Sequence, residues 1–120
     1  MSGRNVIEEK SIEFAIRIIN LYKFLTTAKS EFVMSKQILR AGTSMDANIA
    51  EAQEAQSKAD FISKLSISLK ECRETRYWLT LLERSDFISK TDSGSLDRDA
   101  SELNALLISI IKTAKLNLNK

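Results

Sequence analysis

The polar residues of one short stretch, RAGTSMDANIAEA at positions 40–52, recur at helical spacing. Arg40, Ser44, Asn48 and Glu51 follow one another at intervals of four, four and three residues, so on a helix they share one face. Most residues between them are small, which lets a second helix come close and find hydrogen-bond partners. The alternative is a solvated helix face, although such faces usually carry more Lys and Glu than this one.

Side chains for catalysis or metal binding are scarce. The chain has no histidine and a single cysteine, Cys72, so it lacks the commonest general base and the commonest metal ligand. A glycine-rich phosphate loop and a carboxylate cluster suited to zinc are absent as well. No base can activate Cys72, so we expect it to be a small buried hydrophobe. The sequence predicts no enzymatic activity, no cofactor and no metal.

The elements that would position these residues are helices. The chain has 120 residues, 43% of them hydrophobic, with no proline and three glycines, which favours long helices in one domain over residues 1–120. Hydrophobic periodicity predicts helices at about 5–26, 31–55, 57–84 and 96–118. Ser30 and Ser57 are candidate N-caps, and 89–95 is the clearest loop. We expect an all-α, up-down-up-down four-helix bundle.

The third predicted helix carries apolar residues on two faces. One arc, which we expect to face the core, holds Phe61, Ile62, Leu65, Leu69, Cys72 and Leu79. Ile67, Trp78 and Leu81 fall roughly opposite. A harmless exposed patch is one interpretation, but three large apolar residues together favour self-association.

Arg76 falls inside the core arc of this helix, where an unpaired charge would be costly. Glu51 or Asn48 on the preceding helix is its expected partner. The small-residue face around Ser44, Asn48 and Ala52 is also a candidate surface for receiving a neighbouring protomer. The two roles compete for the same face.

The stretch at 40–52 and the segment FISKLSISLKECRETRYWLTLL at 61–82 together resemble a bacterial family of ribosomal-protein-like four-helix bundles, the 23S rRNA intervening-sequence proteins. That family typically shows Arg-Ala, then Ser-Ile, then Asn-Ile-Ala-Glu-Gly, and a Leu-rich helix ending near Tyr-Trp-Leu. Ala52 replaces the usual Gly, and Asp46 stands where a Pro is often found. The matching residues are Arg40, Ala41, Ser44, Asn48, Ile49, Ala50, Glu51, Phe61, Leu65, Glu71, Glu74, Tyr77 and Leu79.

The resemblance implies a non-enzymatic, ring-like homo-oligomer. A related protein, the accessory variability determinant of diversity-generating retroelements, forms a pentamer and uses a basic surface to bind nucleic acid and a reverse transcriptase. By that likeness we expect a homopentamer whose partners are nucleic acid and a reverse transcriptase or another protein.

Charge is distributed unevenly along the chain. Residues 1–30 and 57–84 each carry a surplus of two positive charges, 31–56 a surplus of two negative charges, and 85–120 balance. Together with the resemblance, this favours a nucleic-acid-binding accessory protein. The alternative is a structural or adaptor oligomer that binds another protein and no nucleic acid. The candidate nucleic-acid-binding residues are Arg17, Lys23, Lys64, Lys70, Arg73 and Arg84.

The expected cellular compartment follows from the lack of a disulfide and of a membrane-spanning segment. A single cysteine permits no intrachain disulfide, and no apolar run approaches the ~20 residues needed to cross a membrane. We expect a cytoplasmic protein without membrane contact.

Overall fold

The structure, a computed structural model, describes residues 5–118 and contains four helices. The first, α1 (Val6–Ala28), begins with a complete capping box. The Asn5 side chain accepts from the Glu8 amide at 3.1 Å, and the Glu8 carboxylate accepts from the Asn5 amide at 3.1 Å. The predicted first helix is thus confirmed.

The second helix, α2 (Met34–Gln53), starts three residues later than predicted, and its cap is not Ser30. Ser30 adopts a left-handed conformation, with φ of 50°, and turns the chain. The N-cap residue, Val33, makes no side-chain cap; instead, the Glu31 carboxylate two residues earlier accepts from the amides of Val33, Met34 and Ser35 at 3.2, 3.0 and 2.7 Å. Burial alone would raise the pKa of Glu31, but the amide hydrogen bonds outweigh it and leave the pKa below its ordinary value.

The third helix, α3 (Lys58–Arg84), has the predicted bounds. The Ser57 hydroxyl caps it by accepting from the Asp60 amide at 3.0 Å. The reciprocal half of a capping box is not formed, because the Asp60 carboxylate accepts from the Gln56 amide instead, at 3.4 Å.

The fourth helix, α4 (Lys90–Leu118), shows that the predicted loop at 89–95 is wrong. The Ser89 hydroxyl accepts from the Asp92 amide at 3.0 Å and starts the helix there. Gly94, which suggested a loop, lies inside α4 with nothing within 4 Å of an added Cβ. The chain reverses at Asp86, which has a φ of 66°.

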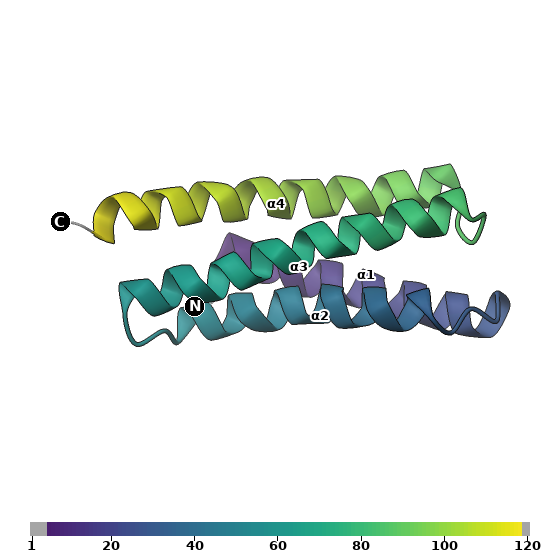
Figure 1. Cartoon of the computed structure of the whole chain (residues 1–120), viewed down its shortest axis with the longest axis horizontal. Helices are drawn as coiled ribbons and strands as arrows, with labels where there is room; N and C mark the ends of the chain where they lie inside the picture. Colours follow the sequence, from purple (N-terminus) through teal and green to yellow (C-terminus); the bar gives the residue numbers. More distant parts are fainter. Residues whose placement is uncertain (1–4, 119–120) are drawn as a thin grey trace.

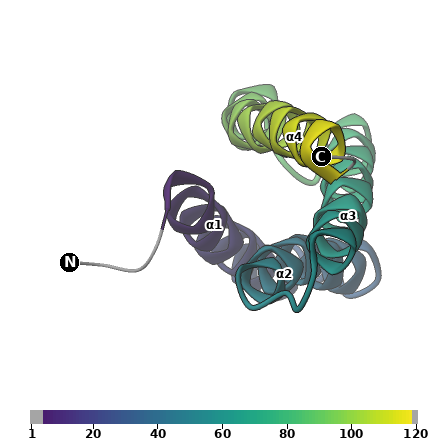
Figure 2. The same ribbon diagram turned by 90° about the vertical axis from the view of Figure 1, so that its left-hand side faces the viewer.

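Successive helices run antiparallel, and no strand occurs between residues 5 and 118 (Figure 1). Viewed end-on, the four helices follow an arc in chain order, with α1 and α4 at its two ends (Figure 2). Polar contacts join those ends: Arg17 to Asp99 at 2.7 Å and Lys10 to Glu102 at 3.1 Å. The observed arrangement is an all-α, bundle-like fold.

The core runs between all four helices, and a glycine on α2 lets α1 approach closely. A Cβ added to Gly42 on α2 would meet the Ile18 side chain of α1 at 3.0 Å. Ser11 donates to Asp46 at 2.9 Å across the same pair of helices, and α2 continues without a break through Asp46. The largest fully buried apolar side chains are Phe14, Ile18, Leu25, Ile38, Met45, Ile49, Leu65, Leu79, Leu82, Leu103 and Leu107.

Candidate nucleic-acid interface

The buried face of α3 is rotated toward α2 relative to the predicted apolar arc. Ser68, Glu71 and Thr75 are buried beside the apolar residues, whereas the predicted core residues Phe61, Ile62 and Leu69 are only partly buried. The Ser68 hydroxyl donates to the backbone carbonyl of Met45 on α2 at 2.8 Å. Small polar side chains therefore fill the α2–α3 contact, and hydrophobicity alone could not reveal them.

Arg40 joins α2 to this rotated face. Its guanidinium donates to the Glu71 carboxylate at 2.8 Å and also to Glu74. The indole N–H of Trp78 donates to the same Glu74 carboxylate at 3.1 Å. The hydrogen bond from Trp78, reinforced by Arg40, lowers the pKa of Glu74. Arg40, one of the residues that match the family pattern, thus links α2 to α3 through two carboxylates.

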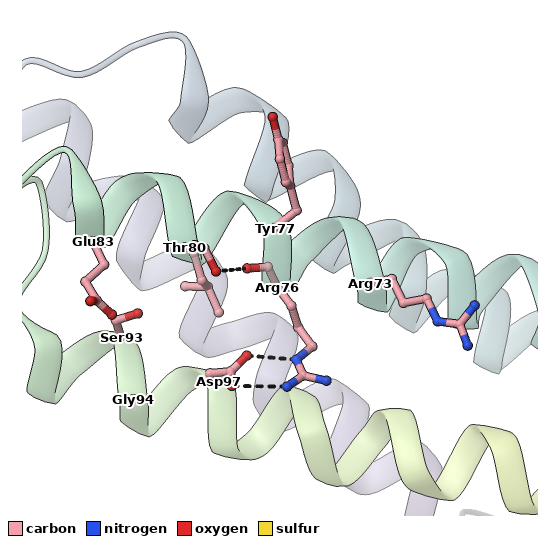
Figure 3. A pocket seen from close by; sticks show the side chains of 9 residues that line it. Arg73, Arg76, Tyr77, Thr80, Glu83, Ser93, Gly94 and Asp97 are labelled. Atoms are coloured by element: carbon pink, nitrogen blue, oxygen red, sulfur yellow. Dashed lines mark hydrogen bonds and ion pairs between the residues drawn. The ribbon is translucent and has the colours of Figure 1, made fainter.

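The predicted pairing of Arg76 with Glu51 or Asn48 is wrong. Because α3 is rotated toward α2, Arg76 faces α4 and pairs bidentately with Asp97 at 2.8 and 3.2 Å (Figure 3). The Asp97 hydrogen bond raises the pKa of Arg76. Glu51 instead pairs with Lys64 at 3.2 Å, and the Asn48 amide donates to the Ser44 carbonyl at 2.9 Å.

The same rotation changes the environment of the second apolar group on α3. Ile67 is 43% exposed, as expected for a residue away from the core. Trp78 and Leu81 are half-buried, and Trp78 packs against the core, so its predicted position opposite the core is wrong. These two side chains expose less apolar surface than the sequence suggested.

The six candidate nucleic-acid-binding residues do not form one surface. Arg17 donates to Asp99 and Ser95 across the α1–α4 seam, and Lys64 is paired with Glu51. Lys23 is exposed on α1, which does not adjoin α3. The remaining three candidates, Lys70, Arg73 and Arg84, lie on one side of α3.

We call these three exposed residues, Lys70, Arg73 and Arg84, the basic stripe. They lie along the solvent face of α3, spread over about 21 Å at 1.5 Å per residue, with Tyr77 between Arg73 and Arg84. Within residues 5–118, none of the three side chains forms an ion pair. The stripe therefore presents positive charge to solvent, which the Glu74 carboxylate near Lys70 offsets in part.

A groove between α3 and α4 adds two cations that the sequence reasoning missed. It measures about 390 Å³ and is lined by the apolar residues Leu69, Ile108 and Ile111 and by Arg73, Lys112 and Lys115. No carboxylate lines it. A signal was present in the sequence, because residues 103–118 contain both lysines and no Asp or Glu.

A second groove of about 450 Å³ lies between the same helices and contains the Arg76–Asp97 pair (Figure 3). Arg73 lines both grooves, so the two adjoin at this residue. Glu83 and Asp97 make the second groove less positive than the first. The electropositive surface is therefore centred on Arg73.

Three further findings concern the thiol, metal ligands and membrane spans in the part of the chain that the structure describes. The Cys72 thiol is fully buried, donates to the Ala100 carbonyl at 3.3 Å, and has its pKa raised to about 11, chiefly by burial. Residues 5–118 contain no group of three or more side chains that could hold a metal ion. None of the described helices is long and apolar enough to cross a membrane.

Comparisons with known proteins agree on one family. The family model described as 23S rRNA-intervening sequence protein matches residues 4–109. A crystal structure from Bacteroides thetaiotaomicron, of a protein with unknown function from the S23 ribosomal protein family, is 61% identical. The match covers 89% of this chain and 99% of that chain, with a TM-score of 0.88. No curated protein matches.

Proposed function

Because the chain belongs to the family of 23S rRNA-intervening sequence proteins, we propose that it is a non-enzymatic accessory protein that binds nucleic acid through its basic stripe. The supporting observation is the electropositive surface at Arg73, where the stripe meets Lys112 and Lys115. Phosphate contacts from Lys and Arg supply most of the sequence-independent affinity for nucleic acid. We expect binding that is weak, sequence-tolerant and salt-sensitive.

Removing charge from this surface tests the proposal. We expect the triple variant Lys70→Gln/Arg73→Gln/Lys112→Gln to bind single-stranded RNA about tenfold to a hundredfold more weakly at about 0.1 M salt. Each lost phosphate contact lowers the slope of log affinity against log salt by about 0.7, so three lower it by about 2. Fluorescence anisotropy of labelled RNA across a salt series measures both quantities.

A matched control removes the same number of charges elsewhere. Lys23→Gln/Lys36→Gln/Lys90→Gln changes three exposed lysines on α1, α2 and the first turn of α4. We expect this variant to retain most of the wild-type affinity, because only net charge changes. If both triple variants lose RNA affinity equally, the loss comes from the change in net charge and not from this particular surface. Undetectable binding of the wild type at low salt would favour the adaptor alternative, in which the partner is a reverse transcriptase or another protein.

We also propose that the protein forms a ring-like homo-oligomer, a pentamer by its likeness to the retroelement accessory protein. Exposed Ile67 supports an apolar contact on α3, since full burial of such a side chain contributes about 1.5 to 3 kcal/mol. We expect Ile67→Glu to reduce the molar mass measured by light scattering at micromolar concentration. The control is Ser66→Glu, which places the same charge at an exposed neighbour. A monomeric wild type contradicts the proposal, and an unchanged mass in Ile67→Glu removes this residue from the interface.

A further inference from the structure

Tyr77 is an exposed aromatic residue within the basic stripe. It is 55% exposed, one helical turn after Arg73 and two turns before Arg84. Tyr77 is one of the residues that line the second groove, which contains the Arg76–Asp97 pair, and its ring points away from Asp97 (Figure 3). An aromatic ring is therefore offered to solvent between cations.

The ring is held in place by a chain of contacts reaching α2. Tyr77 packs edge-to-face on Trp78, with ring centroids 5.0 Å apart and planes inclined by 68°. The Trp78 indole donates to Glu74, and Glu74 accepts from Arg40. These contacts restrict how the two rings can move, so a ligand that contacts Tyr77 has little side-chain ordering left to impose.

Aromatic rings beside cations suit single-stranded nucleic acid. An unpaired base can stack on a tyrosine ring while lysine and arginine contact neighbouring phosphates, whereas the faces of bases in a duplex are already stacked. The stripe, at about 21 Å, would span roughly six stacked nucleotides at 3.4 Å each.

We propose that Tyr77 is a stacking platform for an unpaired base, so that the basic stripe recognises single-stranded over double-stranded nucleic acid. This inference rests on the proposed function and specifies the ligand of the same surface. Stacking on one aromatic residue contributes about 1 to 3 kcal/mol, which corresponds to an affinity change of about 5- to 150-fold.

The test compares two probes by fluorescence anisotropy: a labelled oligouridine of about 12 nucleotides, roughly twice the span of the stripe, and the same strand paired with oligoadenosine. We expect Tyr77→Ala to weaken binding of the single strand about 5- to 150-fold and to leave duplex affinity within about twofold. Tyr77→Phe keeps an aromatic face and should retain affinity for both probes. Trp78 is the chain's single tryptophan, so its emission should change when oligouridine binds the wild type.

A second variant separates stacking from structure. Tyr77→Leu keeps apolar bulk against Trp78 but has no aromatic face, so it should lose single-strand affinity as Tyr77→Ala does. If Tyr77→Ala binds both probes as tightly as the wild type, or loses affinity equally for both, the stacking inference is overturned. In either case, salt-sensitive binding by the wild type would still support the proposed function. A change of molar mass in Tyr77→Ala with no loss of single-strand affinity assigns Tyr77 to a protomer contact and also overturns the inference. Absence of binding to both probes by the wild type overturns both proposals.

Discussion

We expect Arg40→Met to lower the free energy of unfolding by about 2 to 3 kcal/mol. The variant leaves Glu71, whose side chain is only 9% exposed, without the guanidinium that donates to it at 2.8 Å. A fully buried pair would cost more to break, but Arg40 is 51% exposed and water screens part of its charge. Urea denaturation followed by circular dichroism measures the change. Lys36→Met, one turn earlier on the exposed face of α2, is the control for loss of a positive charge.

The double variant Arg40→Met/Glu71→Gln identifies the cause of that loss. If the uncompensated carboxylate is what costs free energy, a neutral amide at position 71 should recover part of the stability. We expect the two substitutions to couple by about 1 to 2 kcal/mol rather than to add. Additive effects would mean that Arg40 stabilises the protein through packing of its aliphatic stem or through Glu74 alone.

Glu31→Gln is expected to cost about 2 kcal/mol at neutral pH. Both carboxylate oxygens of Glu31 accept backbone amides, Oε2 those of Val33 and Met34 and Oε1 that of Ser35. A glutamine has one acceptor oxygen and would turn its NH₂ group toward an amide donor. Glu54→Gln changes an exposed carboxylate at the other end of α2 and should have little effect.

The cost of Glu31→Gln should depend on pH. The pKa of Glu31 is lowered in the folded state, so its contribution to stability is fully present above the unfolded value near 4.5. The contribution is lost as the pH falls through the lowered folded pKa. The difference in urea midpoint between wild type and Glu31→Gln should therefore be largest at pH 5 to 7 and shrink in strong acid. A constant difference would show that the carboxylate charge is not what caps α2.

Local patterns in the sequence predicted the four helices. The bounds of α3, its Ser57 cap and the buried Cys72 follow from hydrophobic period and capping chemistry, which act within a few residues. The turns were harder to predict, because Ser30 and Asp86 take the left-handed conformation that glycine usually provides, while Gly94 lies in a helix. Residue type at a turn is a preference, and the neighbouring caps Glu31 and Ser89 decided where α2 and α4 begin.

The rotation of α3 was decided only by the tertiary structure. Hydrophobicity places its core arc on the large apolar residues, but close packing against α2 also buries Ser68 and Thr75, which hydrogen-bond to backbone carbonyls. This rotation turns Arg76 toward Asp97 on α4 and sets Tyr77 outward between the cations of the basic stripe. Lys112 joins that surface from nearly 40 residues away in sequence, because α4 packs antiparallel beside α3. Periodicity within one helix determines which residues share a face, but only packing between helices determines what that face meets.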